Sequence, residues 1–195
     1  IKLCLISCVW NIFCIILYTH KYTYDFMKPI ASLSNLLELL SEEGDDDYEH
    51  IVQQIQIPFS EIKPHTQWDS NYYTRTCLVR TKKYELLLLC WESGQFSPIH
   101  CHDSQECWMH ILQGYITEER YELDEDGIPI KTNTTLLKEG TSYHINDDLG
   151  FHNLDNNSNE RCVSLHLYAS PIEECSYYSE ESGSFKRKKM SDYSR

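Results

Sequence analysis

The stretch GQFSPIHCH, which runs from Gly94 to His102, decides the fold and the chemistry open to this chain. It ends in two histidines one residue apart, and side chains at that spacing on a β-strand point to the same face. A third histidine, His152, lies in another short strand-like stretch further along. Three neutral imidazoles on one face would bind a metal and leave positions open for substrate and oxygen, as in iron sites with a facial ligand set. The spacing therefore predicts an open redox iron centre and not a structural zinc site, whose coordination would be closed.

The sequence around this stretch is typical of short strands separated by turns. Turn signals occur at Ser93-Gly94, at 124–127, at Glu139-Gly140 and at 156–159. Many short strands at such intervals indicate a mainly β protein, built as a barrel or a sandwich. Strands are expected at 72–80, 84–92, 98–102, 107–113, 115–122, 129–136, 142–145, 151–155 and 161–168.

Helical patterns precede these strands. Leucines between Leu33 and Leu40 recur with the spacing of one helix face, which predicts an amphipathic helix over about 31–42. A second helix is expected from Tyr48 until Pro58 ends it, and a short helical piece between Pro58 and Trp68. We therefore expect one domain over residues 27–195, with a helical cap at about 31–66 and a β-barrel at about 72–190.

The first residues of the chain differ from the rest in composition. The segment from Ile1 to Tyr18 is strongly apolar and carries one charge, at Lys2. Such a stretch suits a membrane anchor or the core of a signal peptide, but no cleavage site with small residues follows it. We expect residues 1–26 to lie outside the domain as a leader of non-coding sequence upstream of a translation start at Met27; a membrane anchor is the alternative.

The composition argues against several classes of partner. Lys and Arg number 17 against 30 Asp and Glu, so the formal net charge is -13. This charge disfavours binding to nucleic acid or to an anionic membrane. The one basic run, at 186–189, is typical of a solvated strand or tail. The 9 cysteines, an odd number without C-x2-C spacing, indicate free thiols in a reducing cytoplasm.

The histidines stand in two spaced motifs. Gly94, five residues and then His100-x-His102 resemble the first motif of the cupins, and Gly140 followed by His152-x3-Asn156 resembles the second. Cupins are jelly rolls of two β-sheets that hold a metal inside. The resemblance therefore implies a cupin jelly-roll barrel with a small N-terminal helical cap.

The first cupin motif usually continues to a glutamate ligand, and this chain departs from that pattern. Cys107 stands in the place of that glutamate, seven residues before Gly114. Glu106 is its neighbour, and on a regular strand the two side chains point to opposite faces. We expect three histidines without a carboxylate. A bulge that turned Glu106 inward would instead add a fourth ligand and imply different chemistry.

Further runs of sequence extend the pattern beyond the histidines. They are Lys28-Pro29, Tyr72 to Arg75, Leu88 to Trp91, Ile99 to His102, Cys107, Leu112 to Gly114, Ile145 to Asp147, Gly150 to His152 and Val163 to Tyr168. Together they resemble the cysteine dioxygenase family from about Met27 onward. By this resemblance, His100, His102 and His152 bind one Fe(II) per chain.

The same resemblance implies a reaction. L-cysteine chelates the iron through its thiolate and amine, O2 takes the remaining position, and both oxygen atoms are added to sulfur. The product is cysteine sulfinic acid. The resemblance thus implies a cytoplasmic, monomeric enzyme of cysteine catabolism and taurine supply.

The resemblance also assigns a substrate pocket. Arg75 matches the residue that binds the substrate carboxylate, and a guanidinium fork fits a carboxylate with two hydrogen bonds. An arginine here favours L-cysteine and argues against cysteamine, which has no carboxylate. Tyr73, Leu89, Trp91 and Cys175 match further positions around the family's pocket, although Leu89 and Trp91 suit an ordinary core equally well.

One expected strand carries a row of polar side chains. Ser164, His166 and Tyr168 alternate along it, so they share one face. They match a hydrogen-bonded line in the family, with the tyrosine hydroxyl near the iron. By the same resemblance, a thioether crosslink joins Cys107 to Tyr168 and holds the phenol in place. The alternative is a tyrosine and a histidine that are simply satisfied in a core.

Two other functions stay open at this point. One is a dioxygenase of another small thiol, such as 3-mercaptopropionate. The other is a metal-binding cupin without catalytic activity. Metal content and a panel of thiols would separate these possibilities.

Overall fold

A computed structural model describes residues 28–42 and 48–190 of the chain, so the leader expected at 1–26 lies outside the described residues. No helix within the described ranges is long and apolar enough to cross a membrane. The strands are β1 (Thr74–Arg80), β2 (Tyr84–Trp91), β3 (Glu106–Gln113), β4 (Tyr115–Leu123), β5 (Pro129–Lys138), β6 (Ser142–Ile145), β7 (Phe151–Asp155), β8 (Cys162–Ala169), β9 (Glu174–Ser179) and β10 (Ser184–Lys189). The helices are α2 (Leu33–Glu42), α3 (Tyr48–Gln53) and α4 (Phe59–Ile62), with short 3-10 helices η2 (Lys63–His65) and η3 (Asp147–Leu149).

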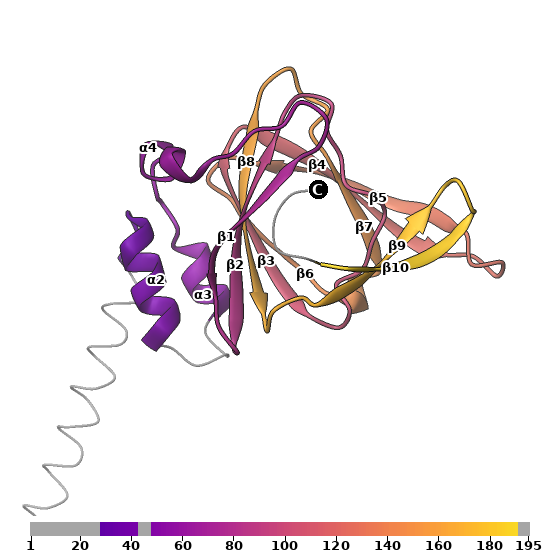
Figure 1. Cartoon of the computed structure of the whole chain (residues 1–195), viewed down its shortest axis with the longest axis horizontal. Coiled ribbons are helices and arrows are strands. Elements are labelled where there is room, and N and C mark those ends of the chain that lie inside the picture. Colours follow the sequence, from indigo (N-terminus) through magenta and orange to yellow (C-terminus); the bar gives the residue numbers. More distant parts are fainter. Residues whose placement is uncertain (1–27, 43–47, 191–195) are drawn as a thin grey trace, which may run out of the picture.

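The strands build two layers that face each other (Figure 1). One layer is a sheet in the order β1-β2-β8-β3-β6, in which all neighbouring strands are antiparallel. The other consists of the sheet β5-β4-β7 and the hairpin of β9 and β10. The backbone of His100 joins these two parts, because it bridges to His152 of β7 and to Tyr177 of β9. This is the mainly β jelly roll of a cupin, as the motifs predict, although among the described residues the two layers do not merge into one closed ladder.

The first layer buries apolar side chains on both faces. Along β2, Leu86 and Leu88 belong to a cluster on the side of the helices, whereas Leu87, Leu89 and Trp91 belong to a cluster between the layers. All residues of β2 are buried, which explains why this strand is an almost continuous apolar run. Alternation along the strand therefore sends every second side chain into the interior, where the candidate site lies.

The helical cap covers the outer face of the same sheet (Figure 1). Leu36 and Leu40 of α2 and Tyr48 of α3 are buried in the outer cluster. The Tyr48 ring meets the rings of Tyr84 and Trp108 edge-on, at a centroid distance of 5.9 Å in each case. Such pairs contribute about 0.5–1.5 kcal/mol beyond the burial of their surface. The first and third predicted helical segments are confirmed as α2 and as α4 with η2. The second is confirmed as α3, but it ends at Gln53 and not at Pro58, because Ile55 pairs with Ile30.

One predicted strand is wrong. Residues 98–102 do not form a strand, and within them His100 alone pairs with strand residues. The reason lies in the backbone donors, because Pro98 has none. The N–H of His102 donates to Oδ1 of Asp147 at 2.8 Å and not to a neighbouring strand. A single bridged residue therefore carries the connection between the two parts of the second layer.

The hairpin of β9 and β10 is absent from the predicted strands. Its residues pair in register from Ser179 and Ser184 to Glu174 and Lys189. The hairpin also holds the histidine-bearing segment, since the N–H of Cys101 donates to the carbonyl of Ser176 at 3.1 Å. The basic run at 186–189 forms β10 and stays exposed to solvent.

Candidate metal centre

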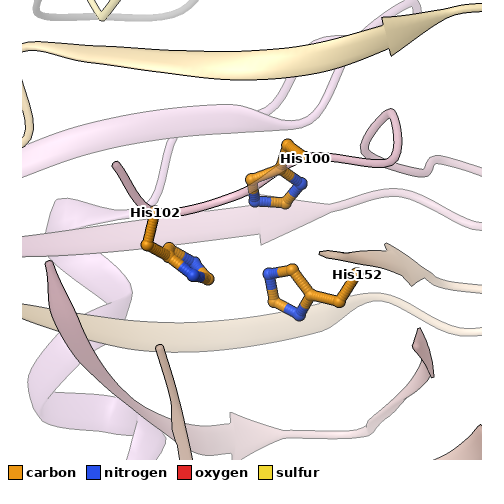
Figure 2. Close-up of side chains that lie close together, drawn as sticks. All are labelled: His100, His102 and His152. Atoms are coloured by element: carbon orange, nitrogen blue, oxygen red, sulfur yellow. The ribbon is translucent and has the colours of Figure 1, made fainter. Parts of the chain in front are cut away.

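Three histidines from distant parts of the chain converge between the two layers. His152 lies on β7, and His100 and His102 lie in the connection between β2 and β3. Their possible ligand nitrogens all lie within 4.8 Å of one another, and Figure 2 shows the three rings turned toward a common point. His102 and His152 are each 1% exposed. The group offers three nitrogen ligands that a single metal ion can reach together.

Hydrogen bonds behind two of the rings leave the other nitrogen free. Nδ1 of His100 donates to the carbonyl of Pro98, and Nδ1 of His152 donates to the carboxylate of Glu118, both at 2.9 Å. A neutral imidazole that donates from Nδ1 carries its lone pair on Nε2. Among the described residues, Nε2 of His152 and Nδ1 of His102 are buried without a hydrogen-bond partner. Buried polar atoms are rarely left without one, so this donor set fits a metal ion.

Burial keeps the three imidazoles in the form that binds metal. Desolvation lowers the pKa of His102 and the pKa of His152 well below the ordinary value of 6.5, and it also lowers the pKa of His100. Repulsion between neighbouring imidazolium charges lowers the pKa of His102 and of His152 further. A metal ligand must be neutral, so no proton has to leave these rings at neutral pH.

A glycine two residues before His152 fixes the start of β7. Gly150 has a φ of 85°, a conformation that side-chain-bearing residues rarely adopt. A Cβ atom at this position would lie 2.7 Å from the backbone oxygen of Tyr121 on β4. This close approach requires glycine, and it explains the Gly150-x-His152 pattern in the sequence.

The loop that follows His102 is anchored by two other parts of the chain. The carboxylate of Asp147 accepts hydrogen bonds from the N–H groups of His102 at 2.8 Å and Ser104 at 2.7 Å. The guanidinium of Arg187 on β10 holds the carboxylate of Asp103 with two hydrogen bonds, at 3.0 and 3.1 Å. Asp103 and Ser104 have positive φ values of 54° and 65°, which are uncommon outside glycine. These contacts stabilise the strained turn beside the metal-binding pair.

Glu106 lies away from the histidine group, as a regular strand predicts. It is hydrogen-bonded to His144 and accepts a hydrogen bond from Nδ2 of Asn146 at 3.1 Å. Its side chain is 44% exposed. The next residue, Cys107, is fully buried in the cluster between the layers. The alternative in which a bulge turns Glu106 inward as a fourth ligand does not hold in this structure.

Arg75 brings a positive charge to the interior. Its charge lowers the pKa of His100 and of His166. For Arg75 the described residues provide no carboxylate, and Nη1 instead donates to the sulfur of Met190 at 3.7 Å. A partly buried cation without a counter-charge is costly, so this position favours an anionic ligand. The other arginines of the described ranges all form ion pairs; they are Arg80, Arg120, Arg161 and Arg187.

Comparison with known proteins identifies the family of the chain. The model of the family described as "Cysteine dioxygenase type I" matches residues 28–181. The chain belongs to the cysteine dioxygenase type I family. It is 28% identical to cysteine dioxygenase type 1 of Rattus norvegicus and 29% identical to that of Homo sapiens, in each case over 88% of this chain and 90% of the relative. A solved structure of a protein with a double-stranded β-helix domain from Klebsiella pneumoniae has a TM-score of 0.48 at 13% identity, over 65% of this chain and 92% of that chain.

The family and the three-histidine group together indicate a metal-binding dioxygenase. In this cysteine dioxygenase family member, polar side chains of the neighbouring strands β2 and β8 form a row of hydrogen bonds on the inner face of the first layer. The indole N–H of Trp91 donates to Oγ of Ser164 at 3.1 Å, and Oγ of Ser164 is 3.0 Å from Nε2 of His166. The ring of Tyr73 stacks on Trp91 at a centroid distance of 4.2 Å. Burial lowers the pKa of His166 to about 3, so this ring is neutral as well.

Tyr168 borders the metal centre and touches Cys107. The two residues are direct partners on the neighbouring strands β8 and β3, and both are buried in the cluster between the layers. Burial raises the pKa of both groups, so both carry their protons. The centroid of the Tyr168 ring lies 5.9 Å from that of His102 and 6.5 Å from that of His166. The phenol therefore stands between the polar line of β8 and the histidine group.

The remaining residues that the family resemblance assigned also lie in the interior. Leu89 is the direct partner of Arg75 on the neighbouring strand and is 5% exposed. The thiol of Cys175 on β9 donates to the sulfur of Met190 at 3.2 Å. The structure thus brings together the cysteine dioxygenase pocket positions Tyr73, Arg75, Leu89, Trp91 and Cys175 on the side of the cluster between the layers.

Sequence reasoning missed two residues of this interior. Glu118 could have been found from the alternation of β4, because Ile116 is fully buried and Glu118 shares its face. Met190 gave no such signal, since it follows an exposed basic strand. Its place beside Arg75 and Cys175 in this cysteine dioxygenase family member is visible in three dimensions alone.

Proposed function

We propose that the protein is an Fe(II)-dependent cysteine dioxygenase that converts L-cysteine and O2 into cysteine sulfinic acid. The observation that carries this proposal is Arg75, a guanidinium without a carboxylate partner among the described residues, in the same interior as three neutral histidines. The histidines suit a metal and the guanidinium suits the carboxylate of an amino acid. We propose further that the enzyme acts as a monomer in the cytoplasm, which fits the free thiols of all six cysteines in the described ranges.

His100, His102 and His152 would hold one Fe(II) ion. Three uncharged ligands on one side of an ion suit open iron sites better than closed zinc sites. Bound iron would supply a Lewis acid that favours the thiolate form of the substrate and a redox centre for O2. The protein contributes three rings that are neutral before metal arrives, of which His100 is held by Pro98 and His152 by Glu118.

Arg75 would bind and orient the substrate through its carboxylate. A guanidinium offers two parallel donors to a carboxylate and so fixes its position and its direction. The stacked pair of Tyr73 and Trp91 lies near in sequence and in space, and it forms a rigid wall of the same interior. Binding at a fixed guanidinium restricts how the thiol of a short amino acid can reach the histidine group.

Tyr168 would act as a hydrogen-bond donor beside the reacting sulfur. Burial holds its pKa well above the ordinary value of 10.0, so the hydroxyl keeps its proton at neutral pH. The neutral His166 lies beside it, and Ser164 and Trp91 hold that ring in turn. A protonated phenol near the site can stabilise negative charge that develops on oxygen.

L-cysteine is one of two small thiols that this site suits. 3-Mercaptopropionate also has a thiol and a carboxylate, so Arg75 would bind it as well. A cupin that binds metal without catalysis is the further rival. The full chain, purified and loaded with Fe(II), would be tested for oxygen uptake with L-cysteine, 3-mercaptopropionate and cysteamine in parallel, with products identified by mass.

Three outcomes of that experiment lead to different conclusions about the enzyme. Oxygen uptake with cysteine sulfinic acid as the main product would support the proposal in full. Faster turnover of 3-mercaptopropionate would keep the dioxygenase and change its substrate. Bound iron without oxygen uptake for any thiol would refute catalysis and favour the binding cupin.

We predict a thioether crosslink between Cys107 and Tyr168. The two residues are direct cross-strand partners and lie in the same buried cluster, so little movement is needed. The new bond joins sulfur to a ring carbon; the thiol hydrogen and one ring hydrogen leave as two protons and two electrons, which O2 accepts. Intact-mass measurement after turnover should show a fraction lighter by two hydrogen atoms. Cys107→Ser is the control and should lack that fraction, and its absence from the turned-over natural protein would contradict the prediction.

A further inference from the structure

Glu118 is a buried carboxylate in contact with the metal centre. Its side chain on β4 is 2% exposed, and the side chain of His152 on β7 is 1% exposed. Oε1 of Glu118 accepts a hydrogen bond from Nδ1 of His152 at 2.9 Å. Oε2 accepts one from Nε of Arg120 at 3.1 Å. Both oxygens are thus used in a chain that runs from the histidine through the carboxylate to the guanidinium.

The strand register makes this contact a built feature of the sheet. Arg120 is the direct partner of His152 on the neighbouring strands β4 and β7, and Glu118 is the partner of Leu154. Residues two apart share a face, so Glu118 lies diagonally across from His152 and within reach of it. The carboxylate is held by residues of two paired strands and by no loop.

We propose that Glu118 is a positioning residue for the metal centre, which orients His152 and supplies the negative charge that the three ligands lack. The proposal rests on the proposed function only in that the histidine group binds Fe(II). A carboxylate behind an imidazole fixes the proton on Nδ1, directs the Nε2 lone pair to the ion and strengthens the ligand. The common iron site takes its negative charge from a ligating carboxylate. Here that charge lies one imidazole further from the ion.

The three histidines differ in what stands behind them, and this difference singles out His152. Nδ1 of His100 faces the neutral carbonyl of Pro98. Nδ1 of His102 has no hydrogen-bond partner among the described residues. His152 alone among the three has a carboxylate behind its ring. Removing the charge of Glu118 should therefore weaken one metal bond in particular.

Arg120 makes the buried carboxylate tolerable. A buried charge without a partner is destabilising, and a hydrogen-bonded cation offsets much of that cost. The side chain of Arg120 is 25% exposed, so it connects the buried Glu118 to solvent. Glu119, the next residue along β4, pairs with Lys131 and accepts a hydrogen bond from Tyr121. It offers a matched carboxylate on the same strand, away from His152.

The test compares Glu118→Gln with Glu119→Gln in the full chain. Affinity for Fe(II) is measured without oxygen by competition with a coloured chelator. Glu118→Gln removes the charge with almost no change of shape, and we expect the affinity to fall about 10- to 100-fold. Glu119→Gln should change the Fe(II) affinity by less than about twofold, which is the deviation usual between sites that do not interact. Unchanged affinity in a folded Glu118→Gln variant would overturn the proposal.

A second background separates positioning from general destabilisation. In a His152→Gln chain, Glu118→Gln should change the residual Fe(II) affinity by less than about twofold, because the ring it acts through is gone. An equal loss in both backgrounds would overturn the positioning role. If Glu118→Gln does not fold, Glu118→Asp keeps the charge beside Arg120 but withdraws it from His152, and unchanged affinity there would also overturn it. Failure of the natural chain to bind Fe(II) at all would instead refute the proposed function.

Discussion

Replacement of His102 by alanine is expected to abolish iron binding. The variant should lose at least about a hundredfold in affinity, since changes to groups that merely support a ligand already cost about 10- to 100-fold. Of the three histidines, His102 can be replaced with the least disturbance of other side chains. Nδ1 of His102 has no hydrogen-bond partner among the described residues, so replacing the ring leaves no other polar side chain unpaired. Loss of His152 would by contrast leave Glu118 without its buried partner.

Iron content of the purified His102→Ala variant, measured after incubation with Fe(II) and removal of excess metal, checks this prediction. His144→Gln is the matched control, because His144 pairs with Glu106 and stacks on Trp108. It should bind iron as the natural protein does. A His102→Ala variant that retains one iron per chain would contradict the assignment of the metal centre.

Replacement of Arg75 by alanine is expected to raise KM for L-cysteine about 10- to 100-fold while iron content stays normal. Hydrogen bonds to a charged group contribute about 1.5–3 kcal/mol, and each 1.4 kcal/mol corresponds to about a factor of ten. Arg75 lies on β1 opposite Leu89, and among the described residues no carboxylate pairs with it. Replacing Arg75 therefore leaves no buried carboxylate without its partner. Its removal should therefore act on substrate binding and not on the fold.

Steady-state oxygen uptake with L-cysteine and with cysteamine distinguishes this role from a general one. Turnover of cysteamine, which lacks a carboxylate, should be insensitive to Arg75→Ala. Arg75→Lys keeps the charge without the two-donor fork and should give an intermediate KM. Arg161→Ala is the control, because the side chain of Arg161 is 52% exposed and pairs with Glu92. An unchanged KM in Arg75→Ala would refute the carboxylate-binding role.

The sequence predicts the parts of this fold in which side chains alternate between two environments. β2 and β8 are buried on both faces, so their apolar runs and the row Ser164, His166 and Tyr168 are visible in one dimension. The same alternation correctly separates Glu106, which faces outward, from Cys107, which faces the interior. The three histidines of the candidate metal centre stand out because they occur in two spaced motifs.

The prediction fails where long-range contacts override local pattern. Residues 98–102 carry the alternation of a strand, but a proline and the hydrogen bond to Asp147 reduce them to one bridged position. β10 is a run of charged residues, and its place depends on pairing with β9 and on the grip of Arg187 on Asp103. Met190 directly follows β10, so its contact with Arg75 also depends on how the hairpin is placed. No local property of these segments encodes their partners.

The anchoring of the loop from His100 to Asp103 also determines when, during synthesis of the chain, the candidate metal centre can be completed. The backbone of His100 pairs with Tyr177, and Asp103 is held by Arg187. Both partners are synthesised after all three ligands. During synthesis the three histidines are therefore made before the residues that hold their loop in place. The candidate metal centre is complete only after the final hairpin has been made and has folded against this loop.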